Sequence, residues 1–289
     1  MRVSCTKAQT ISTCGRLYQL RYEDRLESLM KSLALVIGRA IDTACSGYLL
    51  SHALGAPFDM KSVFDESLDT LLFKQQVRFP ANWDADTARA VGHIMCDRFP
   101  EEWEKSHLVA AVDREGAPIV QRRLVVPLPN GHELEVVIDV VVMDLLTGEF
   151  AVLDLKTTSQ GLSPESPFGY NAFQLTTYQY AADLAFAAFL GSMSNVGFME
   201  MIKRVPAKTS RGKGPTVEAP RFYPRRSPEQ INEMVRAYLA YIGDIQNRRF
   251  HRAINNAYNN PCDMCDFSRL CVHNDRTGIT QRQSPHKAA

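Results

Sequence analysis

Residues 136–158 carry three charged side chains inside a segment that is otherwise rich in valine, leucine and isoleucine: Asp139, Asp154 and Lys156. An isolated charge among such neighbours costs free energy unless it is paired or bound to a metal ion. Two carboxylates can hold a hard divalent cation, and water bound to such a cation becomes a nucleophile. The residue types therefore predict a metal-dependent hydrolytic site.

A hairpin is the element that would bring these charges together. A turn at Thr147-Gly148 pairs the two apolar runs so that the numbers of facing residues sum to 295, with Asp139 opposite Lys156 and diagonal to Asp154. Because side chains alternate between the faces of a strand, Asp154 and Lys156 share one face, and Asp139 joins them there.

The alternative is an edge hairpin with one exposed polar face and a surface ion pair. Two observations argue against it. The charged face also carries valines, and the opposite face is wholly apolar, comprising Ile138, Val140, Val142, Leu153 and Leu155. Strands that are apolar on both faces are typical of a sheet covered on both sides.

Composition narrows the class of protein. The chain has 289 residues, 45% of them hydrophobic, and a net charge of +1, which predicts one large or two modest globular domains without a global basic signature. No apolar run approaches the length of a membrane span, and the N-terminus lacks the apolar region of a signal peptide. Seven cysteines in such a chain predict a reducing compartment, with thiols that are buried or bind a ligand.

Hydrophobic periodicity and turn signals predict the elements that surround the hairpin. Helices are expected at 33–54, 61–105 with breaks, 173–190 and about 228–250, and strands at 118–126, 132–144 and 194–205. Ser227 and Gln230 predict a capping box at the start of the last helix. This order of elements indicates an α/β fold with a mixed central sheet flanked by helices.

Three cysteines near the C-terminus, Cys262, Cys265 and Cys271, form a C-x2-C-x5-C pattern that lets several thiolates reach one ion or cluster. Cys14 is the best distant candidate for a fourth ligand; Cys5, Cys45 and His273 are weaker. Zinc and an iron–sulfur cluster fit the spacing equally well, and three unconnected thiols are the alternative.

A basic segment follows the last predicted strand and has no acidic residue within it. It contains Lys203, Arg204, Lys208, Arg211 and Lys213. A positive loop beside a catalytic cleft would follow the phosphates of DNA, and a solvated surface loop is the alternative. Trp83 and Trp103 are predicted to be packing residues, with base-stacking platforms as the weaker alternative.

Several motifs occur in a characteristic order. In chain order they are Cys14-Gly15-Arg16-Leu17-Tyr18, Gly38 with Asp42, Asp139, Asp154-Leu155-Lys156, Gln174 with Tyr178, and Cys262, Cys265 and Cys271. Over residues 10–273, this order resembles the PD-(D/E)XK nucleases of the RecB type, especially the iron–sulfur group of CRISPR-associated RecB-like and phage exonucleases. The chain departs from that pattern at Asp42, where the family has histidine, at Gly15, where it has proline, and at residues 136–138.

The resemblance implies roles for individual residues. Asp139, Asp154 and the main-chain carbonyl of Leu155 would hold Mg²⁺ or Mn²⁺, with Asp42 as a further ligand or as a weaker substitute for histidine. Lys156 would orient or deprotonate the attacking water. Gln174 and Tyr178, four residues apart on one helix face, would position the scissile strand or support Lys156; ordinary polar helix residues are the alternative. Cys14, Cys262, Cys265 and Cys271 would hold a 4Fe–4S cluster, with zinc as the alternative.

The resemblance also implies an organisation and a function. Residues 1–274 would form one restriction-endonuclease-like domain, with a helical insertion at about 55–110, a cysteine segment at 260–274 and a disordered polar tail at 275–289. The expected activity is that of a metal-dependent DNA exonuclease on single strands or DNA ends, in recombination, repair or phage DNA processing, in the cytoplasm of a bacterial or phage-infected cell. A homo-oligomer or a helicase or integrase partner would fit the family.

Two other functions remain open. One is a DNA-binding or adaptor protein, such as a spacer-acquisition partner, that keeps the fold with weak or no catalysis; Asp42 favours it. The other is a sequence-specific endonuclease, which would need a recognition domain that the sequence does not indicate.

Overall fold

The computed structural model describes residues 1–163, 166–206, 212–253 and 261–282. The chain divides into two compact units. Unit 1 comprises residues 1–31, 127–134 and 235–289, and unit 2 comprises residues 32–126 and 135–234.

The sheet of unit 2 is mixed. Its centre is formed by β7 (His132–Asp144), β8 (Phe150–Thr158) and β9 (Asn195–Ile202), where β7 and β8 are antiparallel and β8 and β9 are parallel. β10 (Thr216–Val217) and β11 (Arg221–Pro224) pair with β9, and β5 (Leu108–Ala110) and β6 (Val120–Leu128) pair with β7. This arrangement confirms the predicted α/β fold with a mixed central sheet.

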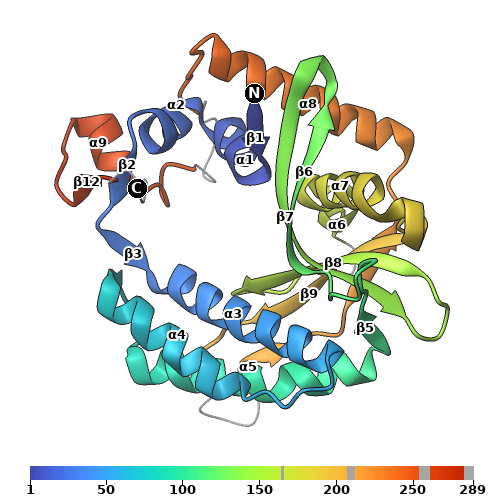
Figure 1. The fold of residues 1–289 in the computed structure, drawn as a ribbon. Helices are drawn as coiled ribbons and strands as arrows, with labels where there is room; N and C mark the ends of the chain where they lie inside the picture. The colour runs from blue at the N-terminus through green and yellow to red at the C-terminus, as the bar shows by residue number, and fades with distance from the viewer. Residues whose placement is uncertain (164–165, 207–211, 254–260, 283–289) are drawn as a thin grey trace, which may run out of the picture. The chain divides into compact units, whose positions relative to one another are not determined.

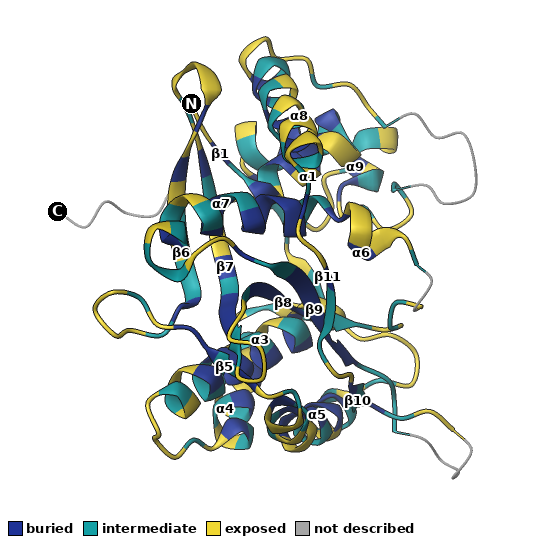
Figure 2. Cartoon of the chain, turned by 90° about the vertical axis from the view of Figure 1, so that its right-hand side faces the viewer, coloured by how far each residue is buried: buried dark blue, intermediate teal, exposed yellow. Residues whose placement is uncertain are grey.

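Helices cover both faces of this sheet (Figure 1). On one side lie α3 (Leu33–Ala53), α4 (Met60–Lys74) and α5 (Ala85–Lys105), and on the other lie α6 (Phe168–Asn171) and α7 (Phe173–Leu190). A short strand, β4 (Gln76–Arg78), separates α4 from α5. Between these layers, β9 is buried from Val196 to Ile202 and β8 from Ala151 to Leu155 (Figure 2).

The main core of unit 2 lies between α3, α4, α5 and the sheet. Val140 and Leu153 of the hairpin pack there with Phe64 and the fully buried Trp103. The apolar face that the sequence predicts for the hairpin is therefore a core face.

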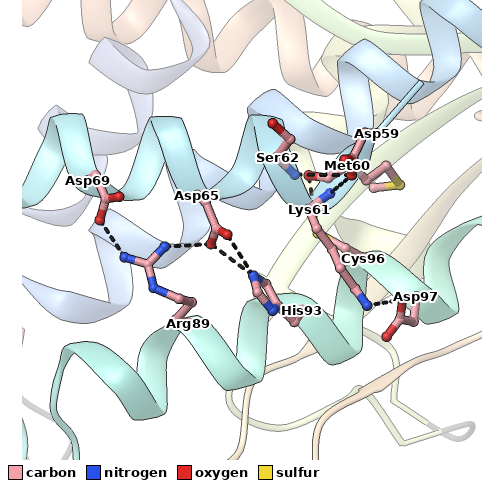
Figure 3. A network of polar contacts seen from close by, with 10 residues as sticks. All are labelled: Asp59, Met60, Lys61, Ser62, Asp65, Asp69, Arg89, His93, Cys96 and Asp97. Carbon is pink, nitrogen blue, oxygen red and sulfur yellow. Dashed lines mark hydrogen bonds and ion pairs between the residues drawn. The ribbon is translucent and has the colours of Figure 1, made fainter. Parts of the chain in front are cut away.

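Polar contacts join α4 to α5 on the outer side of this layer (Figure 3). Arg89 of α5 forms ion pairs with Asp65 and Asp69 of α4, and His93 contacts Asp65. Gly92 of α5 lies opposite Phe64 of α4, and a Cβ atom at position 92 would come within 1.9 Å of the Phe64 ring. The two helices therefore approach closely because α5 has no side chain at this position.

Capping side chains explain where several helices begin. Ser32 accepts a hydrogen bond from Leu35 N at the start of α3, and Asp84 accepts one from Thr87 N at the start of α5. The predicted capping box of α8 (Pro228–Gln246) is present: Gln230 N donates to Ser227 Oγ, and Ser227 N donates to Gln230 Oε1.

Among the described residues, one helix, α3, is long and apolar enough to pass a test for a membrane span by length and composition. Half of that stretch is buried inside the protein, which is also the pattern of a core helix. The test is therefore weak evidence for a span.

The register of the central hairpin differs from the prediction. Val140 pairs with Leu153 and Val142 with Ala151, so the numbers of facing residues sum to 293 and not to 295. The chain turns over a longer loop, in which Asp144 N donates to Glu149 O at 2.9 Å and Gly148 has a φ of +74°. A shift of two residues leaves every side chain on its predicted face, but it aligns Asp139 with Asp154 and not with Lys156.

Unit 1 combines the two ends of the chain. Near the N-terminus it contains β1 (Arg2–Ser4), α1 (Cys5–Thr13), α2 (Gly15–Tyr18), the π-helical turn Gln19–Glu23, β2 (Leu26–Ser28) and β3, which begins at Met30 and ends at Ser32. A 3-10 turn, Pro129–Gly131, most of α8, α9 (Ser268–His273) and β12 (Ile279–Gln281) complete it. Part of the expected tail is thus strand β12, which pairs with β2; residues 283–289 lie outside the described residues.

Candidate active site

Asp154 and Lys156 occupy alternate positions on β8 and share one face of the sheet. The Asp154 side chain is fully buried, whereas that of Lys156 is 39% exposed. Lys156 Nζ lies 2.9 Å from Asp154 Oδ2 and 3.2 Å from Oδ1. The lysine thus reaches from a buried carboxylate towards solvent, where a substrate can meet it.

Gln174, in the first turn of α7, joins this pair from the neighbouring helix. Its Oε1 accepts a hydrogen bond from Lys156 Nζ at 2.8 Å, and its Nε2 donates to Asp154 Oδ1 at 2.9 Å. The same Nε2 lies 2.8 Å from the hydroxyl of Tyr178, one turn further along α7. The structure therefore brings both predicted residues of this helix to the charged pair.

Asp139 on β7 completes the group. Its Oδ2 accepts a hydrogen bond from Leu155 N at 2.9 Å, which fixes the carboxylate beside β8. Burial raises the pKa of Asp139 well above its usual value, and the charge of Asp154 raises it further. Burial also raises the pKa of Asp154, although Lys156 opposes that shift. Two buried carboxylates with raised pKa values form a site that a cation would stabilise.

The donors at this point suit a hard divalent cation. Asp154 Oδ2 is buried, and within the described residues its polar contact is the ion pair with Lys156 Nζ at 2.9 Å. A carboxylate oxygen has more than one lone pair, so this atom can also bind a cation. Carboxylate and carbonyl oxygens are the ligands that Mg²⁺ and Mn²⁺ prefer. In the described part of the chain, no three His, Cys, Asp or Glu side chains are grouped so that they could hold a metal ion. The carboxylates that the structure places beside Lys156 and Leu155 N are those of Asp154 and Asp139.

Asp42 on α3 lies within electrostatic range of this group. Burial raises the pKa of Asp42, and the charge of Asp154 raises it further, whereas Lys156 lowers it. Gln121 Nε2 donates to Asp42 Oδ1 at 3.1 Å and to Ser46 Oγ at 3.0 Å. Asp42 is therefore near enough for its charge to interact with Asp154 and Lys156, and its carboxylate is bound by a side chain from β6.

Gln121 is a residue that sequence reasoning missed. Its φ of +47° is left-handed, which is uncommon for a residue other than glycine and is retained where the surroundings require it. A glutamine in a strand gives no signal for this conformation in the sequence.

Glu200 is a second residue that was missed. It pairs with Lys156 across β8 and β9, is buried, and accepts hydrogen bonds from Leu162 N at 3.1 Å on both carboxylate oxygens. One acid within the apolar run of β9 is the same kind of signal that identified Asp139, so this residue could have been found.

The predicted basic loop is described only in part, because Lys208 and Arg211 lie outside the described residues. Lys203 Nζ donates to the carbonyl oxygens of Ala34 at 3.3 Å and Thr157 at 3.4 Å, and burial lowers the pKa of Lys203. Arg204 and Lys213 line a cavity of about 660 Å³.

The four cysteines predicted as ligands all belong to unit 1, and none of these four described residues is in a disulfide bond. Cys14 Sγ accepts hydrogen bonds from Leu17 N and Ala253 N, both at 3.4 Å, and lines a cavity of about 490 Å³. Burial raises the pKa of Cys265, and the charges of Cys262 and Cys14 raise it further, so these thiols lie near one another. The described positions do not assemble three of them around one ion.

The fold and site define an α/β protein with two buried carboxylates and a lysine on adjacent strands of a mixed sheet. The sequence profile of the PD-(D/E)XK nuclease superfamily matches residues 2–272, and the chain belongs to that superfamily. A search of curated proteins gave no match. The solved crystal structure of SSO0001 is similar over 85% of this chain and 87% of that chain, with 10% sequence identity and a TM-score of 0.33.

Proposed function

We propose that the protein is a deoxyribonuclease that depends on Mg²⁺ or Mn²⁺ and degrades single-stranded DNA or DNA ends as an exonuclease. The observation that carries this proposal is the group in which Asp139, Asp154, Lys156 and Gln174 meet beside β8. The superfamily match supports a nuclease. Single strands and ends are proposed from the resemblance to the RecB-like exonucleases.

Each residue of the group has a chemical task in this proposal. Asp139, Asp154 and the Leu155 carbonyl would hold the cation, which would supply Lewis-acid chemistry at the phosphate. Lys156 contacts the attacking water or a phosphate oxygen, because its side chain reaches solvent. Gln174 fixes the position of Lys156 Nζ, and Tyr178 fixes Gln174. Asp42 is a further oxygen donor or a second negative charge at the edge of the site.

The cysteines have a separate, structural task. We assign the chain to the RecB-like group with a 4Fe–4S cluster, or zinc as the alternative, held by Cys14, Cys262, Cys265 and Cys271. The proximity of Cys14 and Cys262 to Cys265 and the cavity beside Cys14 support this assignment. Four thiolates are the ligand set that both kinds of centre accept. No step of the reaction passes through this centre.

A second candidate function is that of a DNA-binding or adaptor protein with weak or absent catalysis, such as a partner in spacer acquisition. It is favoured by Asp42, which stands where the family has histidine and is bound by Gln121. The resemblance alone supports two further proposals, which apply to both candidate functions. The partner would be a second copy of the chain, a helicase or an integrase. The setting would be the cytoplasm, in recombination, repair or phage DNA processing.

Cleavage assays separate the two functions. Linear and circular single-stranded DNA and a blunt duplex are incubated with Mg²⁺, Mn²⁺ or EDTA. We expect cleavage of linear single strands that requires metal, spares circles and falls by at least about a hundredfold in Lys156→Ala, because the lysine acts on the reacting atoms. Lys105→Ala, an exposed lysine on α5, is the control.

Cleavage by Lys156→Ala at the wild-type rate would refute the assigned site. Tight DNA binding without cleavage under any metal condition would establish the adaptor function instead, and cleavage of circles would identify an endonuclease.

A further inference from the structure

Two cavities of unit 2 meet at Arg204 and are not used by the metal site. The first, of about 660 Å³, is lined by four cationic residues from α5, β11 and the segments after β9: Arg98, Arg204, Lys213 and Arg221. The second, of about 330 Å³, is lined mainly by apolar side chains and by Trp83, Lys203 and Arg204. Both volumes fall in the range of small-ligand sites.

Several cationic side chains of the first cavity have no partner among the described residues. In the part of the chain that the structure describes, the side chains of Arg98, Arg204 and Lys213 form no hydrogen bond or ion pair. Arg221 is anchored, because its Nη1 donates to Leu162 O at 3.0 Å and Ser163 O at 3.2 Å. A concave surface with unpaired cations attracts a polyanion.

Acidic residues balance this charge only partly. Glu200 and Glu218 line the same cavity as the four cations. The Glu200 carboxylate is buried and accepts hydrogen bonds from Leu162 N. Four cations against two carboxylates leave a net formal charge of +2 on the lining.

The second cavity offers an aromatic wall. Trp83 is half-buried: it packs against the main core of unit 2 and also lines the cavity, together with Pro80 and Leu33. An indole beside a guanidinium is suited to a nucleobase whose phosphate lies on the arginine. A base inside a duplex stack cannot enter such a pocket unless it is unpaired.

Both cavities adjoin the strands that carry the metal site. Ser159, one residue beyond the end of β8, lines the second cavity, and Lys203 beside it donates to Thr157 O. Glu200, which lines the first cavity, pairs with Lys156 across β8 and β9. A strand whose scissile phosphate lies at Lys156 can therefore continue into these cavities.

From this geometry we propose that the two cavities form one subsite for unpaired nucleic acid, in which a base lies against Trp83 and the adjoining phosphates lie on Arg204, Arg98 and Lys213. The inference rests on the proposed nuclease function and deepens it, because it locates where the unpaired strand is held and which side chains bind its base and phosphates.

Tryptophan fluorescence tests the subsite directly. The chain has two tryptophans, and Trp103 is fully buried, so a ligand that stacks on Trp83 quenches only that residue. Single-stranded oligothymidylate, titrated in EDTA so that no cleavage occurs, should quench the wild type. Trp83→Phe should bind with no change in the remaining Trp103 signal.

Anisotropy titrations with labelled oligothymidylate measure how much each side chain of the subsite contributes to the binding affinity. Trp83→Leu should raise the Kd by about tenfold, as expected for the loss of one base stack. Arg204→Gln and Arg98→Gln should each reduce the slope of log Kd against log salt concentration by about 0.7. Lys105→Gln, on the same helix as Arg98, is the matched control and should leave Kd and slope unchanged.

Wild-type binding without quenching would overturn the subsite. Kd values and salt slopes in Arg204→Gln and Arg98→Gln equal to those of the control would do the same. The arginine variants keep the test valid if Trp83→Leu fails to fold. Equal affinity for a blunt duplex would also overturn it. Failure of the nuclease function is distinguishable, since the titrations need no catalysis and an inactive binder would still show the quenching.

Discussion

Gln174 is the residue through which the charged group is held in one geometry. It contacts Lys156, Asp154 and Tyr178 at once. Its amide oxygen accepts a hydrogen bond from Lys156, and its amide nitrogen contacts both Asp154 and Tyr178. A side chain with both a donor and an acceptor is needed, because the lysine and the carboxylate have opposite requirements. Glutamine meets this need, whereas glutamate would place a third negative charge beside Asp154.

Replacing Gln174 therefore tests a positioning residue. We expect Gln174→Ala to lower kcat by about ten- to a hundredfold with little change in KM, because Lys156 would no longer be fixed at the reacting atoms. Steady-state kinetics on linear single-stranded DNA measure this, with the exposed Gln246→Ala as the control. A change in KM alone would assign Gln174 to DNA binding and not to Lys156.

Lys203 makes a prediction about pH. Burial lowers its pKa below the ordinary value of 10.5, so between the two values the unfolded chain binds more protons than the folded one, and the stability due to this residue rises with pH. Urea unfolding of the wild type and Lys203→Met at pH 7 and pH 10 measures the difference. Lys203→Met should gain stability over the wild type at pH 7, and the gain should shrink at pH 10. A gain that is equal at both pH values would contradict the shift.

At the scale of elements, the packing of α3, α4 and α5 against the sheet determines where Asp42 lies. Gly92 lets α4 and α5 approach, and the ion pairs of Arg89 with Asp65 and Asp69 then join them (Figure 3). These ion pairs are largely solvent-accessible and contribute little each. The close approach at Gly92 is therefore the feature that matters more for stability.

Two glycine-to-alanine substitutions should act in opposite directions. Gly92→Ala forces a Cβ atom into the Phe64 ring and should destabilise unit 2 by about 1–3 kcal/mol. Gly38→Ala in α3 meets only Thr157 Cβ at 3.9 Å and should stabilise it by about 0.5–1 kcal/mol through better helix propensity. Chemical denaturation measures both free energies of unfolding; the same sign for both would refute the packing argument.

The elements show which features a sequence can predict. The apolar periods predict α3, α7 and β7 closely, and strand alternation places Asp139, Asp154 and Lys156 on one face. The register could not be read from Thr147-Gly148, because the chain uses a longer loop there. The left-handed Gln121 depends on tertiary contacts with α3, which no local pattern encodes.

At the scale of the whole molecule, unit 1 draws on both chain ends, and its two described apolar clusters are small. One contains Leu20, Leu26, Phe267 and Leu270, and the other contains Ile11, Tyr18 and Ile245. A bound centre at the four proposed cysteines would add a cross-link between segments that are far apart in sequence.

Protein purified without oxygen should therefore be brown if the centre is an iron–sulfur cluster and colourless if it is zinc. Cys265→Ser should lose the centre and lower the melting temperature, because ligand binding is linked to folding. Metal analysis, visible absorbance and thermal unfolding measure these effects. Cys96→Ser, a core thiol of unit 2, is the control for losing a cysteine without losing the centre. Wild-type protein without iron or zinc would exclude the proposal.

The composition of unit 1 also sets the order in which the protein can mature on the ribosome. Residues 1–31 are synthesised before unit 2, whereas their partners in residues 235–289 are synthesised after it. Residues 32–234 hold all of unit 2. That unit can therefore fold before residues 235–289, the partners of residues 1–31, have been synthesised. A stalled or prematurely terminated chain would therefore expose the apolar side chains of α1 and α2, which makes them the expected point of chaperone capture or proteolysis during synthesis.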